Sequence, residues 1–136
     1  MARILLTEDD DGVRLFVQRA LMMDGHDVKT AEDGSYAMDV LSEHDGSFDL
    51  LLTDIKMPMM DGIALAQSAA KDWPDITILM MTGFADQRER CDSLNAIVHD
   101  VVSKPFSLAE IRGAVKDALS GEAAIAPPSM VRSLYG

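Results

Sequence analysis

Short apolar runs that end in polar residues recur along this 136-residue chain and constrain its fold more than any other feature. Such runs are typical of strands that are buried on both faces of a parallel sheet. One further stretch alternates polar and apolar residues, as a strand at a sheet edge does. Together they predict five strands, at Ile4–Thr7, Asp27–Ala31 (the alternating stretch), Leu50–Thr53, Ile76–Met81 and Ile97–Val102.

Between these strands, apolar residues recur at spacings of three and four, the period of an amphipathic helix. This pattern predicts five helices, around residues 13–21, 37–41, 63–69, 88–95 and 108–119. The last helix begins at Ser107-Leu108-Ala109-Glu110, a capping box in which the serine and the glutamate satisfy free backbone N–H groups. Parallel strands need crossover connections, and helices supply them. The expected fold is α/β, a doubly wound five-stranded parallel sheet with five helices.

Length and composition limit what the chain can do. We expect one domain over residues 1–120 and a flexible C-terminal tail over 121–136, where two prolines bar a continuous helix. The net charge of −11 argues against nucleic-acid or acidic-membrane partners. No run approaches the roughly 20 apolar residues of a membrane helix, and no secretory signal is evident, so a cytoplasmic protein is expected. The ten methionines, Met59 among them, are expected to fill gaps in the core.

The residues that follow the predicted strands carry the chemistry. Glu8 and Asp9 follow the first strand, Asp54 the third, Thr82 the fourth and Lys104 the fifth. In open parallel sheets, ligands bind at this carboxyl edge. Three carboxylates there favour a hard cation such as Mg²⁺, and a hydroxyl and an ammonium beside it would hold phosphoryl oxygens. Asp54, alone at the end of an apolar strand, is the best candidate for the nucleophile that accepts the group.

Each of these residues also has a plainer interpretation. Asp9, Asp10 or Asp11 could simply cap the first helix. Thr82-Gly83 could be an ordinary turn, and Lys104 a solvated charge. The single residues leave these alternatives open, and only the joint pattern favours a phosphoryl site.

Four spaced motifs bear on the family. They are Ile4-Leu5-Leu6-Thr7-Glu8-Asp9-Asp10, Asp54-Ile55-Lys56-Met57-Pro58-Met59-Met60-Asp61-Gly62, Met81-Thr82-Gly83 and Lys104-Pro105-Phe106. With this set, residues 2–120 resemble the receiver domain of two-component response regulators. The resemblance implies a flavodoxin-like fold of the CheY type. It also implies that Asp54 takes a phosphoryl group from a sensor histidine kinase or a histidine phosphotransfer protein.

The resemblance further implies roles for the site residues. Mg²⁺ would be held by Asp9, Asp54 and the backbone carbonyl of Lys56, with Glu8 acting through water. The chain would then be a signalling switch that catalyses only its own phosphorylation and dephosphorylation, rather than an enzyme acting on other substrates.

Thr82 and Lys104 would hold the phosphoryl oxygens, and the Lys104–Pro105 peptide bond would be cis. Phosphorylation would draw Thr82 inward and shift the following loop between two states. Two positions depart from the family pattern: Val101 stands where receivers usually carry tyrosine or phenylalanine, and Ile97 where they usually carry glycine. A rotating aromatic ring at position 101 is therefore not available, and Phe84 is the alternative carrier of the signal.

A narrower resemblance, to single-domain regulators of the CpdR type, lies in residues 7–11, 81–90 and 101–106. It implies that the unphosphorylated form binds the ClpX unfoldase and primes the ClpXP protease for cell-cycle substrates, and that phosphorylation switches this binding off. Only residues 121–136 follow the fifth helix, so we expect the output to be a protein contact. The expected output surface includes Phe84, Arg88, Val101 and Ser103.

Other functions share parts of this pattern. Within the same class, the chain could be a phosphorelay shuttle or a chemotaxis-type regulator with a different target. A haloacid-dehalogenase-like phosphatase also uses an aspartate nucleophile, but it needs a second aspartate two residues later, where this chain has Lys56. Nucleotide-binding glycine loops are absent from the sequence.

Overall fold

The computed structural model describes residues 2–83 and 96–120, and within them five strands form one parallel sheet in the order β2-β1-β3-β4-β5. The strands are β1 (Arg3–Thr7), β2 (Asp27–Ala31), β3 (Leu50–Asp54), β4 (Thr77–Thr82) and β5 (Asp100–Ser103). The alternating strand β2 lies at an edge, as the sequence predicts, and the more apolar β1 and β3 lie inside the sheet.

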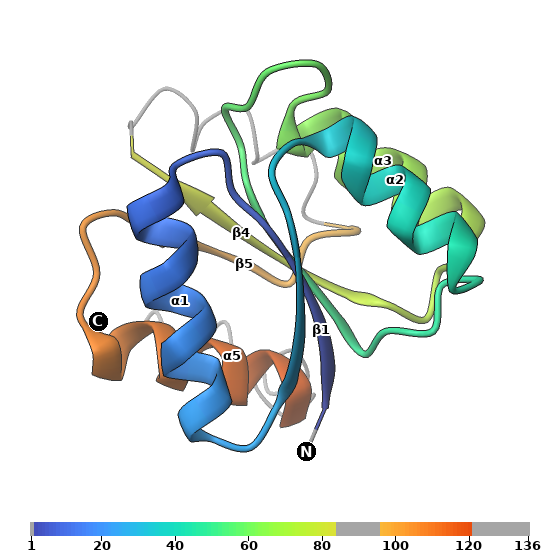
Figure 1. Cartoon of the computed structure of the whole chain (residues 1–136). Helices are drawn as coiled ribbons and strands as arrows, with labels where there is room; N and C mark the ends of the chain where they lie inside the picture. Colours follow the sequence, from blue (N-terminus) through green and yellow to red (C-terminus); the bar gives the residue numbers. More distant parts are fainter. Residues whose placement is uncertain (1, 84–95, 121–136) are drawn as a thin grey trace.

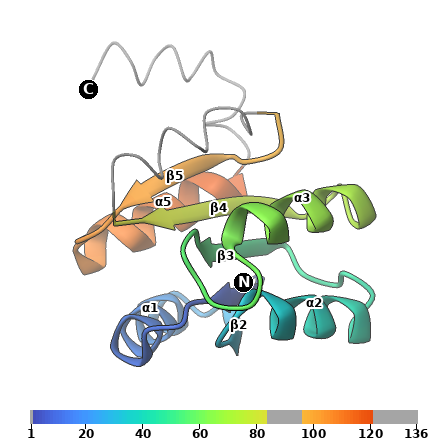
Figure 2. The ribbon, with the colours of Figure 1, turned by 90° about the horizontal axis from the view of Figure 1, so that it is seen from above.

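Helices cover both faces of the sheet. They are α1 (Asp11–Met23), α2 (Gly34–Glu43), α3 (Gly62–Asp72) and α5 (Leu108–Ser120). Figures 1 and 2 show α1 and α5 on one face and α2 and α3 on the other. The doubly wound parallel sheet is therefore confirmed. The helix predicted at 88–95 and the tail at 121–136 lie outside the described residues. In the part that is described, no helix has the length and apolar character needed to cross a membrane.

Alternate residues of the central strands supply two cores. Leu5 and Leu51 pack in the cluster under α2 and α3, whereas Leu6 and Leu52 pack in the cluster under α1 and α5. All four side chains are fully buried. A fully buried leucine contributes about 1.5–3 kcal/mol relative to an exposed one. The two cores thus hold β1 and β3 rigidly, and with them the residues at the ends of these strands.

Local signals set where the helices begin. The capping box at the start of α5 is formed as predicted: the Ser107 N–H donates to Glu110 Oε1 at 2.9 Å, and the Glu110 N–H donates to Ser107 Oγ at 3.0 Å. Asp10 caps α1, because its Oδ1 accepts from the Val13 N–H at 3.0 Å. This decides the first open alternative, since the cap is Asp10 and neither Asp9 nor Asp11.

The boundaries of four strands differ from the prediction; β1 begins at Arg3 rather than Ile4, and β3 ends at Asp54 rather than Thr53. β5 begins at Asp100, which pairs with Leu79, and not at Ile97. Ile97 lies in a turn and packs, half-buried, against the core under α2 and α3. An apolar run indicates that its residues are buried, wholly or in part, but a half-buried residue such as Ile97 need not pair in a strand. β4 is shifted by one residue from the predicted range and includes Thr82 as its last residue.

The prediction that the methionines fill gaps in the core was wrong for Met22, Met23 and Met59, whereas Met57, Met80 and Met81 are buried. The Met59 side chain is the most exposed of them, at 82%. Met59 lies in the turn after β3 with a left-handed backbone, at a φ of 72°. The turn sets the direction of this side chain, and hydrophobic character alone did not reveal it.

Candidate functional site

The sheet register brings the predicted site residues to one edge. Asp54, the last residue of β3, pairs with Met81, and Thr82 pairs with Ser103 at the end of β5. The Lys104 N–H donates to the Thr82 carbonyl oxygen at 2.7 Å, which fixes Lys104 beside Thr82. Glu8 directly follows β1, the strand next to β3. Four strand ends therefore meet at this carboxyl edge.

The Lys104 ammonium lies between two buried carboxylates. Its Nζ is 2.7 Å from Glu8 Oε1 and 3.1 Å from Asp54 Oδ2. Glu8 is fully buried, Asp54 is 5% exposed, and the Lys104 side chain is 22% exposed. Little water reaches these ion pairs, so each charge depends on its partners for stabilisation.

Each oxygen of the Asp54 carboxylate has a partner that fixes the orientation of the group. Oδ1 accepts from the Ile55 N–H at 2.9 Å, while Oδ2 faces Lys104. A backbone donor on one oxygen and the Lys104 ammonium on the other together orient the carboxylate. This pre-organisation suits a group that must react in one direction.

Asp9 completes a cluster of three carboxylates. One oxygen from each of Glu8, Asp9 and Asp54 lies within 4.8 Å of the others. Carboxylate oxygens are the ligands that Mg²⁺ prefers, and these three outnumber the Lys104 ammonium among them. The donor set and the excess negative charge therefore fit a divalent cation.

Burial and neighbouring charges shift the pKa values of these groups. Burial raises the pKa of Glu8, although Lys104 and the Asp10 N–H oppose the rise. Partial desolvation and then the proximity of Glu8 raise the pKa of Asp9. Burial acts to lower the pKa of Lys104, but Glu8 and Asp54 together outweigh it and the pKa is raised, so the amine stays charged.

The remaining predicted residues have the following places. The Lys104–Pro105 peptide bond is cis, the form that the resemblance to receivers implies. Lys56 lies in the turn after β3 with its side chain exposed, and its carbonyl stays a predicted ligand. Val101 packs half-buried against the core under α2 and α3, and Ser103 is exposed. Phe84 and Arg88 lie outside the described residues.

Two residues at the site were missed by sequence reasoning. Arg14 donates from Nη1 to the Glu8 carbonyl oxygen at 2.8 Å. A Cβ atom placed on Gly62 would collide with the Asp54 carbonyl oxygen and come within 3.0 Å of Ile55 Cα. The Asp61-Gly62 pair was visible in the second motif, but a motif does not tell which backbone the glycine approaches.

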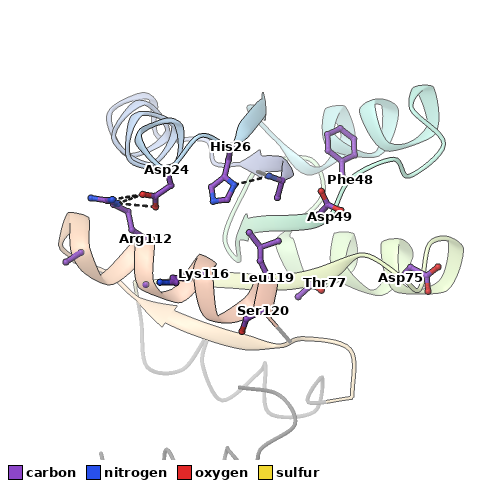
Figure 3. A pocket seen from close by; sticks show the side chains of 13 residues that line it. Asp24, His26, Phe48, Asp49, Asp75, Thr77, Arg112, Lys116, Leu119 and Ser120 are labelled. Atoms are coloured by element: carbon purple, nitrogen blue, oxygen red, sulfur yellow. Dashed lines mark hydrogen bonds and ion pairs between the residues drawn. The ribbon is translucent and has the colours of Figure 1, made fainter. Parts of the chain in front are cut away.

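A second concavity lies at the opposite edge of the sheet. It measures about 1080 Å³ and is lined by residues near the amino ends of the strands and by α5 (Figure 3). Arg112 of α5 pairs there with Asp24, with Nε to Oδ distances of 3.0 and 3.1 Å, and the Ala2 N–H donates to His26 Nδ1 at 3.1 Å. Glu8, Asp9 and Asp54 do not line it, so its size does not make it the candidate site.

Comparison with known proteins places the chain in a family. Residues 4–116 match the model of the response regulator receiver domain. The response regulator receiver protein CpdR of Brucella abortus is 44% identical over 111 residues, which cover 82% of this chain and 91% of that protein. The sensor kinase CckA of Brucella abortus is 34% identical over 118 residues, which cover 87% of this chain but only 12% of the kinase.

Solved structures agree with this placement. One of them is the response regulator protein TrrA of Thermotoga maritima, which was solved in complex with Mg²⁺-BeF. It superposes on this chain with a TM-score of 0.77 at 29% sequence identity, and the superposition covers 88% of this chain and 100% of the TrrA chain. The family model matches residues 4–116, and the match to CpdR extends over 91% of that protein. This chain therefore belongs to the family of response regulator receiver domains.

Proposed function

We propose that this chain is a phosphorylation-controlled switch in which Asp54 accepts a phosphoryl group from a phosphohistidine on a sensor histidine kinase or a histidine phosphotransfer protein. The observation that carries the proposal is the setting of Asp54. It is a nearly buried carboxylate, held by the Ile55 N–H and 3.1 Å from the Lys104 ammonium, beside two further carboxylates.

In the proposed reaction, an Asp54 carboxylate oxygen forms a bond to phosphorus as the P–N bond of the donor breaks. The electron pair of that bond leaves with the imidazole of the donor. The Lys104 ammonium stabilises the negative charge on the phosphoryl oxygens, and the Thr82 hydroxyl is proposed to donate to one of them. Positioning and charge therefore account for the contribution of the protein.

A divalent cation belongs to the same proposal. Asp9, Asp54 and the Lys56 carbonyl are the proposed ligands, and Glu8 the proposed partner through water. Bound Mg²⁺ would offset the charge of the carboxylates and of the incoming phosphoryl oxygens. The support is the cluster of three carboxylates and the likeness to TrrA, which was solved with Mg²⁺-BeF.

Labelling by a small phosphodonor tests the switch. With Mg²⁺ and acetyl phosphate, we expect the wild type to take up one phosphoryl group and Asp54→Ala to take up none, measured by intact mass. Asp33→Ala removes the carboxylate that caps α2 and serves as the matched control, which should still be labelled. A wild type that stays unlabelled, or an Asp54→Ala chain that is labelled equally, would sink the proposal.

The protein donor must dock close to Asp54, and α1 offers an apolar surface for it. Four of its large side chains are exposed by between 41% and 62%, namely Leu15, Phe16, Met22 and Met23. The Phe16 ring stacks on Phe106 at a centroid distance of 6.4 Å, and both rings line, together with Lys104, a groove of about 460 Å³. Exposed apolar patches beside a reaction site mark interfaces, so we propose that an apolar helix face of the donor docks here.

Phe16→Ala should separate docking from chemistry. We expect transfer from a phosphorylated kinase domain that labels the wild type to slow about tenfold, because an aromatic anchor at an interface contributes more than about 1 kcal/mol. Labelling by acetyl phosphate should be unchanged, since this donor needs no docking surface. Tyr36→Ala, which removes an exposed ring from α2, is the control and should leave both rates unchanged. Equal loss with both donors would contradict the assignment.

The finer proposal concerns the output. The similarity to CpdR, which covers 91% of that protein, supports a single-domain regulator, and the resemblance implies ClpX as the partner of the unphosphorylated form. Of the expected contact residues, Ser103 is exposed at the end of β5. A phosphorelay shuttle or a chemotaxis-type regulator remains the alternative. Membership of the receiver family is at odds with a haloacid-dehalogenase-like phosphatase.

Capture of the chain by purified ClpX distinguishes these outputs. We expect the unphosphorylated wild type and Asp54→Ala to bind, and acetyl phosphate with Mg²⁺ to release only the wild type. Absence of binding in every state would overturn the protease-adaptor proposal while leaving phosphoryl acceptance intact. Binding that ignores phosphorylation would overturn the proposed control.

A further inference from the structure

We propose that Arg14 is a positioning residue for the metal site, and that it acts by holding the acidic loop, residues Glu8–Asp11. In this arrangement Glu8 is a support that anchors Lys104, and Asp9 and Asp54 are left to bind the cation. The inference rests on the proposed function and deepens it, because it gives Glu8 the support of Lys104 besides its proposed contact with the cation through water.

Every polar group of Glu8 already has a partner within the protein. Its N–H donates to the Ala31 carbonyl oxygen at 3.1 Å, and its own carbonyl oxygen accepts from Arg14 Nη1 at 2.8 Å. Its Oε1 accepts from Lys104 Nζ at 2.7 Å and its Oε2 from the Asp10 N–H at 3.1 Å. The side chain is fully buried. A direct bond from Glu8 to a metal would have to break one of these interactions, whereas Asp9 is exposed.

Arg14 spans the loop from one end to the other. While Nη1 binds the Glu8 carbonyl, Nη2 forms an ion pair with the Asp11 carboxylate. The Arg14 N–H donates to the Asp10 carbonyl oxygen at 2.9 Å, which anchors the residue in the first turn of α1. The side chain is only 18% exposed. A guanidinium presents its donors in a rigid planar fork, whereas an ammonium is a compact point charge whose donors rotate, so the guanidinium fixes the geometry of its two acceptors more strictly.

Charge and position predict opposite effects for Arg14. Its positive charge lies on the loop that carries Glu8 and Asp9, where it binds the Glu8 carbonyl oxygen, so by Coulomb repulsion alone its removal should strengthen the binding of a divalent cation. If Arg14 instead holds the loop in the geometry that the cation needs, its removal should weaken binding. Partners that orient metal ligands typically account for 10–100-fold in affinity. The sign of the change therefore separates the two effects.

The test is calorimetric titration of the full chain with Mg²⁺. We expect Arg14→Met to bind Mg²⁺ about tenfold more weakly than the wild type. Arg14→Lys keeps the charge but lacks the planar fork, so it should also bind more weakly, by a smaller factor. Arg19→Met removes an exposed arginine from the same helix and is the charge control, with affinity unchanged or slightly higher. Circular dichroism melting shows whether each variant folds. If Arg14→Met does not fold, the Mg²⁺ affinity of Arg14→Lys decides between the two effects.

The outcomes are distinguishable. Mg²⁺ binding by both Arg14 variants that equals or exceeds that of the wild type overturns the inference and leaves the proposed function standing. A wild type that binds no Mg²⁺ overturns the proposed metal site itself, and the inference with it. Weaker binding by both variants, with the Arg19→Met control unchanged, supports the positioning role.

Discussion

Lys104→Met is expected to slow the phosphorylation of Asp54 by acetyl phosphate at least about a hundredfold, the usual consequence of removing one pre-organised charge from a reacting centre. The Lys104 ammonium is 3.1 Å from Asp54 Oδ2, where negative charge arrives with the phosphoryl group. Methionine fills a similar volume without the charge. Single-turnover labelling measures the rate, and a variant that is labelled at the wild-type rate would contradict the role given to Lys104.

The same substitution should also destabilise the fold. Without the ammonium, the buried Glu8 and Asp54 carboxylates lose their shared counter-charge. Breaking a buried ion pair on one side costs about 3 kcal/mol in the free energy of unfolding. Urea denaturation at pH 7 in a chelator measures this loss. Lys29→Met, on the exposed edge strand β2, is the control and should change the stability by less than about 0.5 kcal/mol.

This loss should depend on pH in a defined direction. Burial raises the pKa of Glu8 in the folded chain, so the folded state binds a proton there more readily than the unfolded state. The resulting stabilisation is present at low pH and disappears as the pH rises through the folded pKa. Above that pKa Glu8 is ionised, and its buried negative charge is then stabilised by the Lys104 ammonium. The difference between the wild type and Lys104→Met should therefore be smallest below about pH 4 and grow with pH, and a constant difference would contradict this account.

Gly62→Ala is the second large effect, with an expected loss of about 1–3 kcal/mol in the free energy of unfolding. A Cβ atom at this first residue of α3 meets the Asp54 carbonyl group and Ile55 Cα, which are backbone atoms and cannot rotate away. Because the shift is imposed on Asp54 itself, labelling by acetyl phosphate should also fall.

Gly113 offers a matched control in another helix. A Cβ atom there has nothing within 4 Å, so Gly113→Ala in α5 should raise the free energy of unfolding by about 0.5–1 kcal/mol through helix propensity. Urea denaturation of both variants gives the comparison. Equal effects of the two substitutions would show that crowding at Asp54 is not the cause.

Much of this architecture could be predicted from local patterns. The apolar runs predicted the strands because a parallel strand buried on both faces must be apolar throughout, and the capping box placed the start of α5 because its two hydrogen bonds join neighbouring residues. The start of β5 could not be placed in this way. Whether Ile97 pairs in a strand or packs from a turn depends on the neighbouring strand, which local hydrophobicity does not describe.

The sequence by itself determined which residues stand at the strand ends, because the polar residue that closes each apolar run is visible in the chain. Only the tertiary structure decided how they divide their duties. It decided that Asp10 caps α1, that Gly62 lies against the Asp54 backbone, and that Glu8 forms an ion pair with Lys104. The last contact joins residues 96 positions apart, and its 2.7 Å geometry depends on the register of every strand between β1 and β5. Such long-range geometry is a property of the packed sheet, and no local pattern in the chain encodes it.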